Sequence, residues 1–377
     1  MQEVSDLQCP MLSSDTAMVE LSLNFKTTHK RWWLLVALNI SFVLVGQTAA
    51  VLLGRFYYAE SGSSLFLATL IQTAGFPILC IPLILIPTDS NSSTLSHPVD
   101  RKYVTVVYVC LGVLLAGDNL LYSVGLSYLS ASTYSLISAT QLAFNAVFSY
   151  FLNSQKFTTL ILNSVIVLTI SASLLAVSDE SGTPAGTSRL EYAIGFLCTV
   201  GASAVYALIL SLMQLSFQKV LKAETFAVVM KMQIYTSLVA TVVSVGGLFA
   251  SGQWKTLGNE MDNFDTGPAS YVMTLVWTGI SWQICSIGVV GLIFLVSSLF
   301  SNVISTAALA ATPIASLIVF HDPMNGVKAL AMLLALWGFA TYLFQNYLDH
   351  RSESIPWIQT HIPTNVREIQ KVSSCIV

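Results

Sequence analysis

Charged side chains are scarce in this 377-residue chain, and that scarcity excludes a soluble globular domain. Asp, Glu, Lys and Arg together make up 9% of the residues, whereas hydrophobic residues make up 54%. Soluble chains are typically about 25% charged, because charged groups keep a protein surface hydrated. The formal net charge is only −3, and the basic residues form no stripe or motif that would bind nucleic acid.

Residues that build catalytic or metal sites are also few and scattered. The six cysteines lie inside or near apolar stretches or in the end segments, which argues against a disulfide framework. The five histidines form no cluster, so no zinc or di-iron site is expected. The chain has no Walker loop for ATP, and its one deep acid lacks the second carboxylate of an aspartyl protease. We therefore expect no enzyme activity, no cofactor and no metal.

Long apolar runs, in contrast, are abundant. A helix that crosses a bilayer core needs about 20 mostly apolar residues, and ten such stretches fill residues 33 to 348. The sequence therefore predicts an all-α integral membrane protein with ten transmembrane helices. The predicted spans are Trp33–Leu53, Leu65–Ile86, Tyr103–Leu126, Ser132–Leu152, Thr158–Val177, Tyr192–Leu212, Phe226–Phe249, Val276–Leu299, Val303–Phe320 and Val327–Tyr347.

The distribution of Lys and Arg predicts the orientation. If both termini are cytoplasmic, most of the basic residues fall in cytoplasmic segments, as the positive-inside rule requires. The plasma membrane is the expected location, with an internal membrane as the alternative. The longest outside loop, over residues 250–270, is predicted to hold a short surface helix.

A linker rich in Gly, Ser, Thr and Pro divides the ten spans five and five. An odd number of spans in each half means that the second half enters the membrane in the opposite sense. Inverted halves are the plan of many secondary transporters, whose sites lie near the midplane between the repeats. The predicted parts are a cytoplasmic tail over 1–30, a first five-helix repeat over 31–178, an extracytoplasmic linker over 179–191, a second five-helix repeat over 192–348 and a cytoplasmic tail over 349–377.

Asp118 is the one acid that lies well inside a predicted span. An acid at that depth is costly unless it faces the bundle interior or water, and apolar surroundings disfavour its charged form. Asp118 is therefore a candidate proton-coupling group. The alternative is a structural acid that is hydrogen-bonded to nearby hydroxyl or backbone groups.

Amide and aromatic side chains at membrane depth are the candidates for binding a solute. A carboxamide offers both donors and an acceptor, which suits the mixed edge of a heterocycle, and an aromatic ring can stack on its face. The alternative is that these groups only bond neighbouring helices or pack the interior. The predicted substrate-binding residues are Gln47, Gln72, Asn119, Gln141, Asn145, Tyr206, Trp282, Gln283 and Asn302.

Specific strings within roughly residues 30 to 348 resemble the plant purine permeases. They are Arg31–Trp33, Gly46-Gln47, Leu53–Tyr58, Ala68–Pro77, Gly117–Tyr122, Ser132–Ile137, Ser281–Gln283, Gly291–Val303 and Phe344–Tyr347. The resemblance implies a member of the drug/metabolite transporter superfamily, with ten helices in two inverted five-helix halves. It also implies import of purine nucleobases, cytokinins or related nitrogen heterocycles, usually with protons.

The leading hypothesis is a secondary active carrier of purine-type heterocycles, driven by protons. Its expected partners are a small heterocyclic substrate, protons and the lipid bilayer, and the sequence does not indicate an oligomeric state. One alternative is a carrier of another small metabolite, such as a vitamin or an alkaloid. Another is a membrane receptor that binds a ligand without transporting it.

Overall fold

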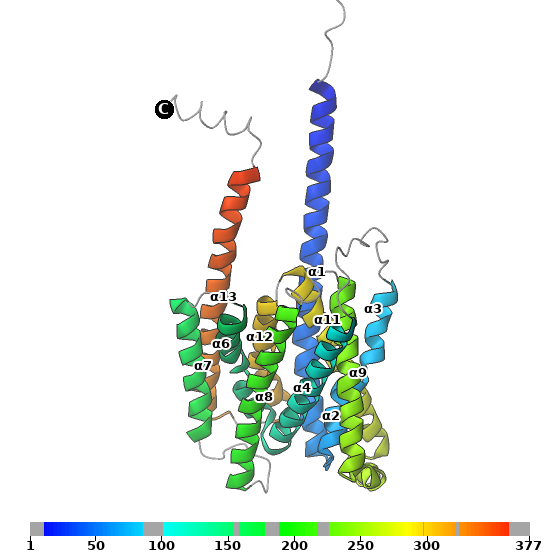
Figure 1. Cartoon of the computed structure of the whole chain (residues 1–377). Helices are drawn as coiled ribbons and strands as arrows, with labels where there is room; N and C mark the ends of the chain where they lie inside the picture. Colours follow the sequence, from blue (N-terminus) through cyan, green and yellow to red (C-terminus); the bar gives the residue numbers. More distant parts are fainter. Residues whose placement is uncertain are drawn as a thin grey trace, which may run out of the picture.

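The computed structural model is a bundle of helices that run side by side along one axis (Figure 1). It describes residues 11–85, 101–153, 158–177, 188–216, 226–296, 298–321 and 324–361, and no strand occurs within these ranges. Helices α1 (Met11–Ala59) and α13 (Gly326–His361) extend from the same end of the bundle. We call this the terminal end and the opposite one the loop end. Most of the predicted linker and part of each predicted tail lie outside the described residues.

Seven helices in the described part are long and apolar enough to cross a membrane, and three shorter apolar segments, Leu65–Leu79, Thr159–Leu174 and Gly326–Tyr342, accompany them. Each of these segments overlaps one predicted span, and the expectation of an all-helical membrane protein is confirmed. The elements between α1 and α13 are α2 (Leu65–Ala74), η1 (Phe76–Leu79), α3 (Cys80–Leu85), α4 (Arg101–Tyr128), α5 (Ala131–Ser138), α6 (Gln141–Asn153), α7 (Thr159–Val177), α8 (Arg189–Ser216), α9 (Phe226–Ala250), η4 (Gln253–Lys255), α10 (Leu257–Asp262), α11 (Pro268–Leu295) and α12 (Ser298–Phe320).

The outside of the bundle is apolar and much of its interior is polar. Large apolar side chains such as Ile84, Phe151 and Ile318 are more than 70% exposed. Buried positions include many Ser, Thr, Asn and Gln side chains. A surface of this kind is unfavourable in water but suits the hydrocarbon core of a bilayer, where polar groups must find partners inside the protein.

Two of the predicted spans are broken in the structure. In the second, α2 ends before Gly75, and Pro77 lies in the first turn of η1, where its missing N–H costs nothing. In the fourth, α5 and α6 are separated at Ala139-Thr140, and the Thr140 hydroxyl donates to the Ile137 carbonyl over 2.7 Å. Broken helices in transporters expose backbone and polar side chains near a binding site.

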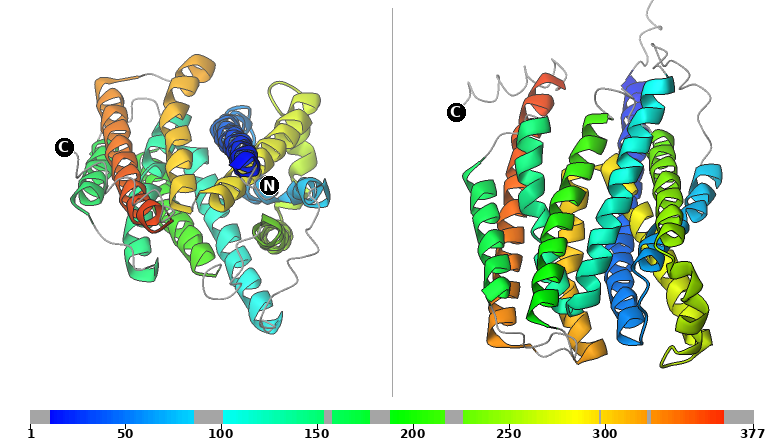
Figure 2. Two further views of the ribbon diagram at one scale, coloured as in Figure 1. Left: turned by 90° about the horizontal axis from the view of Figure 1, so that it is seen from above. Right: turned by 60° about the horizontal axis from the view of Figure 1, so that its bottom comes forward.

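Glycines bring α1 and α11 into direct contact, and Figure 2 shows the two helices side by side when seen from above. A Cβ atom on Gly46 would lie 2.7 Å from the backbone nitrogen of Cys285, and one on Gly288 would lie 2.7 Å from the carbonyl oxygen of Asn39. Small residues allow this close approach of membrane helices. The polar face of α11 is thereby held against the centre of the bundle.

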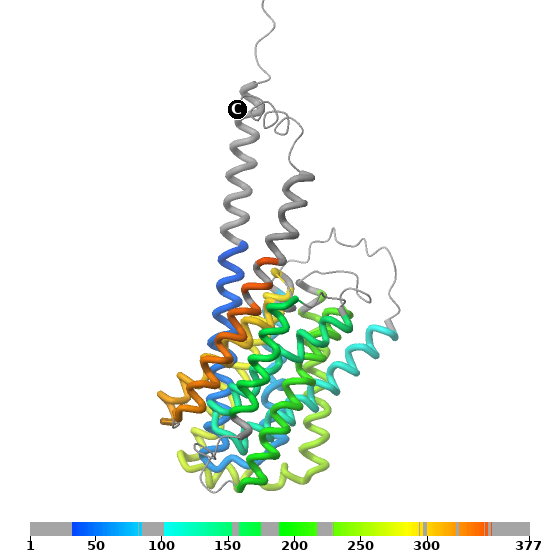
Figure 3. Tube along the Cα trace, turned by 90° about the vertical axis from the view of Figure 1, so that its left-hand side faces the viewer, coloured from blue at the N-terminus to red at the C-terminus, as the bar shows by residue number. Residues whose placement is uncertain are grey.

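At the loop end, the connection between α9 and α11 folds over the turn between α1 and α2 (Figure 3). The predicted short helix in this connection is confirmed as α10. Its Glu260 is buried and accepts hydrogen bonds from the hydroxyl groups of Tyr57, Ser63 and Tyr271. Gln253 adds a further link, because its side-chain oxygen accepts from the Phe66 backbone N–H at 3.2 Å.

Candidate functional site

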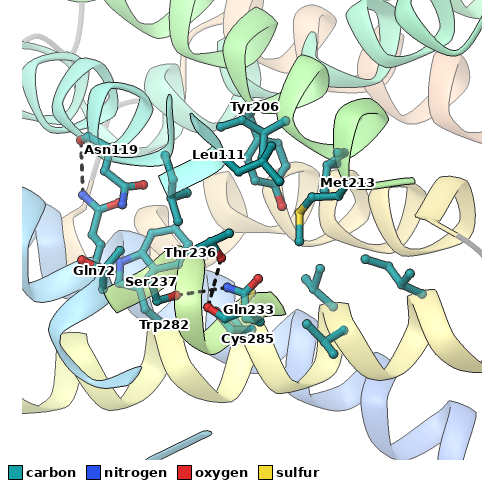
Figure 4. A pocket seen from close by; sticks show the side chains of 18 residues that line it. Gln72, Leu111, Asn119, Tyr206, Met213, Gln233, Thr236, Ser237, Trp282 and Cys285 are labelled. Carbon is teal, nitrogen blue, oxygen red and sulfur yellow. Dashed lines mark hydrogen bonds between the residues drawn. The ribbon is translucent and has the colours of Figure 1, made fainter. Parts of the chain in front are cut away.

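A cavity of about 100 Å³ lies among α2, α4, α8, α9 and α11 (Figure 4). Four predicted residues line it: Gln72 from α2, Asn119 from α4, Tyr206 from α8 and Trp282 from α11. Apolar residues, including Met213, form another part of the wall. The cavity therefore combines carboxamides and aromatic rings with apolar surface, as small-molecule sites commonly do.

Trp282 borders two smaller cavities as well. One, of about 30 Å³, lies toward the loop end and is lined by Tyr57, Tyr58, Tyr122 and Tyr134 among others. Another, of about 40 Å³, is lined by the predicted Gln47 and Gln141 together with Tyr206. Trp282 is therefore a shared wall residue of all three cavities.

The carboxamides of Gln72 and Asn119 in the central cavity differ in whether they have hydrogen-bond partners within the protein. The Gln72 Nε2 donates to the Ser123 hydroxyl over 3.1 Å and to the Asn119 carbonyl oxygen over 3.4 Å. No residue in the described part of the chain bonds the side chain of Asn119, which is 7% exposed and borders the cavity. Asn119 is thus available to a solute, whereas Gln72 helps to hold α2 against α4.

Gln47 and Gln141 line the third cavity rather than the central one. The Gln47 Oε1 is buried and has no partner among the described residues. The Gln141 Nε2 donates to the Thr306 hydroxyl of α12 over 3.4 Å. Gln141 therefore combines a contact between helices with a position at a cavity wall.

Three predicted site residues border none of the cavities described above. The Asn145 Oδ1 accepts from the Ser211 hydroxyl at 3.4 Å, and the Gln283 Nε2 donates to the Gln72 carbonyl oxygen at 3.2 Å. The third, Asn302, is 1% exposed, and neither atom of its carboxamide has a partner in the described part of the chain. Buried amides without partners are costly, and within the described residues the Gln283 Oε1 is unpaired as well.

Asp118 lies in α4, directly before Asn119 and one turn before Tyr122. It is 1% exposed, and within the described ranges its Oδ1 has no hydrogen-bond partner. Its carboxyl group is close enough to Tyr122, Tyr134 and Tyr206 to interact with them electrostatically. This environment differs from that of a structural acid, whose buried oxygens are normally both hydrogen-bonded.

Sequence reasoning missed the wall that α9 contributes. Gln233, Thr236 and Ser237 all line the central cavity, as does Cys285 of α11 (Figure 4). Gln233 meets the same criterion as the predicted residues, since it is an amide inside a predicted span. The hydroxyl groups carried no such signal, because Ser and Thr recur throughout the apolar runs.

Comparison with known proteins identifies the family of this chain. The family profile for purine nucleobase transmembrane transport matches residues 34–352. Probable purine permease 11 of Arabidopsis thaliana is 61% identical over 91% of this chain and 90% of its own length. Probable purine permease 13 of the same plant is 55% identical over 87% and 89% of the two chains. The prediction of a transporter rather than an enzyme is confirmed, and the chain belongs to the plant purine permease family.

Proposed function

We propose that this protein carries a purine nucleobase, or a related heterocycle, across a membrane, and that the base binds in the central cavity against Trp282. The observation that carries the proposal is that one cavity combines an aromatic wall with the Asn119 carboxamide, which has no partner among the described residues. A flat heterocycle can stack on an indole ring, and its ring nitrogens and substituents can pair with an amide. A polar group left unpaired in such a dry site costs about 1–3 kcal/mol, which provides discrimination between solutes.

The architecture that we propose has ten spans in two inverted halves. The seven long helices and three shorter apolar segments support the number. The common end of α1 and α13 supports an even count. The excess of basic residues on that side supports cytoplasmic termini, and the plasma membrane is the proposed location.

Substitution of Trp282 tests the proposed site. We expect Trp282→Ala to raise the apparent KM for labelled adenine by about 5- to 150-fold, because base–aromatic stacking contributes about 1–3 kcal/mol. Trp277→Ala is the matched control, since Trp277 lies on the same helix and its side chain is 54% exposed on the outside of the bundle. Equal KM values for the two variants, measured with purified protein in liposomes, would place the substrate elsewhere.

Proton coupling through Asp118 forms part of the proposal. A proton that enters from the loop end neutralises the buried carboxyl group, which then becomes a hydrogen-bond donor to the tyrosines around it. Binding of the proton can thereby change the shape of the neighbouring cavities. Release of the proton at the terminal end completes the cycle.

The variant Asp118→Asn keeps the shape of the side chain and removes its titration. We expect it to lose accumulation of adenine against a gradient while it still exchanges internal for external adenine. Uptake by liposomes with and without an imposed inward proton gradient separates the two activities. If the variant still concentrates adenine with the wild-type pH dependence, another group carries the proton.

A further inference from the structure

Three polar side chains of α9 line the central cavity, and Gln233 is the one that carries a carboxamide. It is the one carboxamide in α9, a helix that is otherwise rich in Val, Ala and Met. Two neighbouring hydroxyl groups on the same wall are already engaged. Thr236 donates to the Met232 carbonyl over 2.9 Å, and Ser237 accepts from Gln233.

The orientation of the Gln233 carboxamide decides which of its two polar groups faces the cavity. The Gln233 Nε2 donates to the Ser237 Oγ over 3.4 Å. Figure 4 shows the Gln233 side-chain oxygen turned away from Ser237. Within the described residues this oxygen accepts no hydrogen bond from a side chain or from the backbone. The cavity therefore presents an acceptor from α9, and a ligand that brings a donor satisfies it.

We propose that Gln233 determines specificity by accepting a hydrogen bond from an amino group on the ring of the substrate. The inference rests on the proposed function, since it requires a heterocycle in this cavity. The carboxamide oxygen can accept a hydrogen bond from the exocyclic amino group of adenine. A ring with an oxo group at the same place would set two acceptors against each other, which disfavours binding. Ser237 is a positioning residue, because its hydroxyl keeps the amide from rotating.

Adenine and hypoxanthine test the proposal, because they differ by an amino and an oxo group at the same ring position. The measurement is the ratio of their apparent KM values in liposomes that contain purified protein. We expect the wild-type protein to favour adenine by about tenfold, the discrimination of one good amide–base pair. Gln233→Met keeps the length of the side chain and removes the acceptor, so the ratio should fall to near one.

Two further variants separate recognition from folding. Ser237→Ala leaves the Gln233 amide in place and frees it to rotate, so adenine uptake should persist while hypoxanthine uptake improves. Gln345→Met makes the same chemical change in α13, away from the cavities described above, and should leave the ratio unchanged. If Gln233→Met does not fold, the ratio of apparent KM values for the two bases in Ser237→Ala tests the proposal instead, because that variant removes only one hydroxyl.

The outcomes distinguish this inference from the function on which it rests. If Trp282→Ala weakens uptake of both bases while Gln233→Met and Ser237→Ala keep the wild-type ratio, the role of Gln233 is refuted and the proposed site stands. A wild-type protein that does not distinguish the two bases also refutes it. If the wild-type protein transports neither base, the proposed function fails and this inference fails with it.

Discussion

Replacing Gly46 by alanine tests the contact between α1 and α11 that holds the polar face of α11 in the bundle. The added Cβ atom would lie 2.7 Å from the Cys285 backbone nitrogen and 2.9 Å from the Ser281 carbonyl oxygen, whereas ordinary van der Waals contact begins at 3.4 Å. Both neighbours are backbone atoms, so no side chain can rotate away and the two helices must separate.

The expected change in stability of Gly46→Ala follows from two opposing effects. Overpacking of a well-packed interior costs about 1–3 kcal/mol, and alanine is better than glycine in a helix by about 1 kcal/mol. Gly246→Ala in α9 is the matched control, since a Cβ atom there meets no atom within 4 Å and gains only the second effect. We therefore expect Gly46→Ala to be less stable than Gly246→Ala by about 1–3 kcal/mol.

The assay is thermal unfolding of the purified variants in detergent, with the wild-type protein alongside. Gly46→Ala should have the lowest Tm of the three, and Gly246→Ala should match or exceed the wild type. If the two variants unfold at the same temperature, α1 and α11 do not pack backbone against backbone as described.

Two further predictions concern the loop end. Arg55 donates from Nη1 to the carbonyl oxygens of Leu126 and Ser127 at the end of α4, over 3.1 and 3.2 Å. Because hydrogen bonds to charged groups contribute about 1.5–3 kcal/mol, Arg55→Ala should lower the Tm. Arg55→Lys should lower it less. Glu260→Gln replaces one acceptor oxygen of a buried carboxyl group by a donor, so the hydroxyl groups of Tyr57, Ser63 and Tyr271 lose part of their acceptor. Faster hydrogen exchange in residues 253–267 of the variant is the expected result, and unchanged exchange would contradict the described network.

Composition and apolar run length predicted the membrane class because a bilayer demands apolar segments of a fixed length. A proline inside the second span, Pro77, indicates a kink there, whereas the break after Ser138 was not predicted. The apolar pattern continues through both, and they depend on local features: Gly75 and Pro77 in one case, and the Thr140 hydroxyl in the other. Hydropathy is insensitive to such features.

The candidate site was likewise only partly predictable from the sequence. The presence of amides and aromatic residues at membrane depth indicated Asn119 and Trp282, which both line the central cavity. The rotation of each helix about its axis was not accessible from one sequence, so nothing distinguished Asn119 from Asn145, which bonds Ser211 instead. Gln233 met the same criterion, as an amide inside a predicted span, and was overlooked; the structure shows that it lines the central cavity.

Uptake of labelled adenine into liposomes that contain only the purified protein tests the central claim most directly. With an inward proton gradient, the account predicts saturable uptake that unlabelled purines compete for, that rises above the external concentration, and that protein-free liposomes lack. Correctly inserted protein that gives no saturable uptake of any purine would contradict the account.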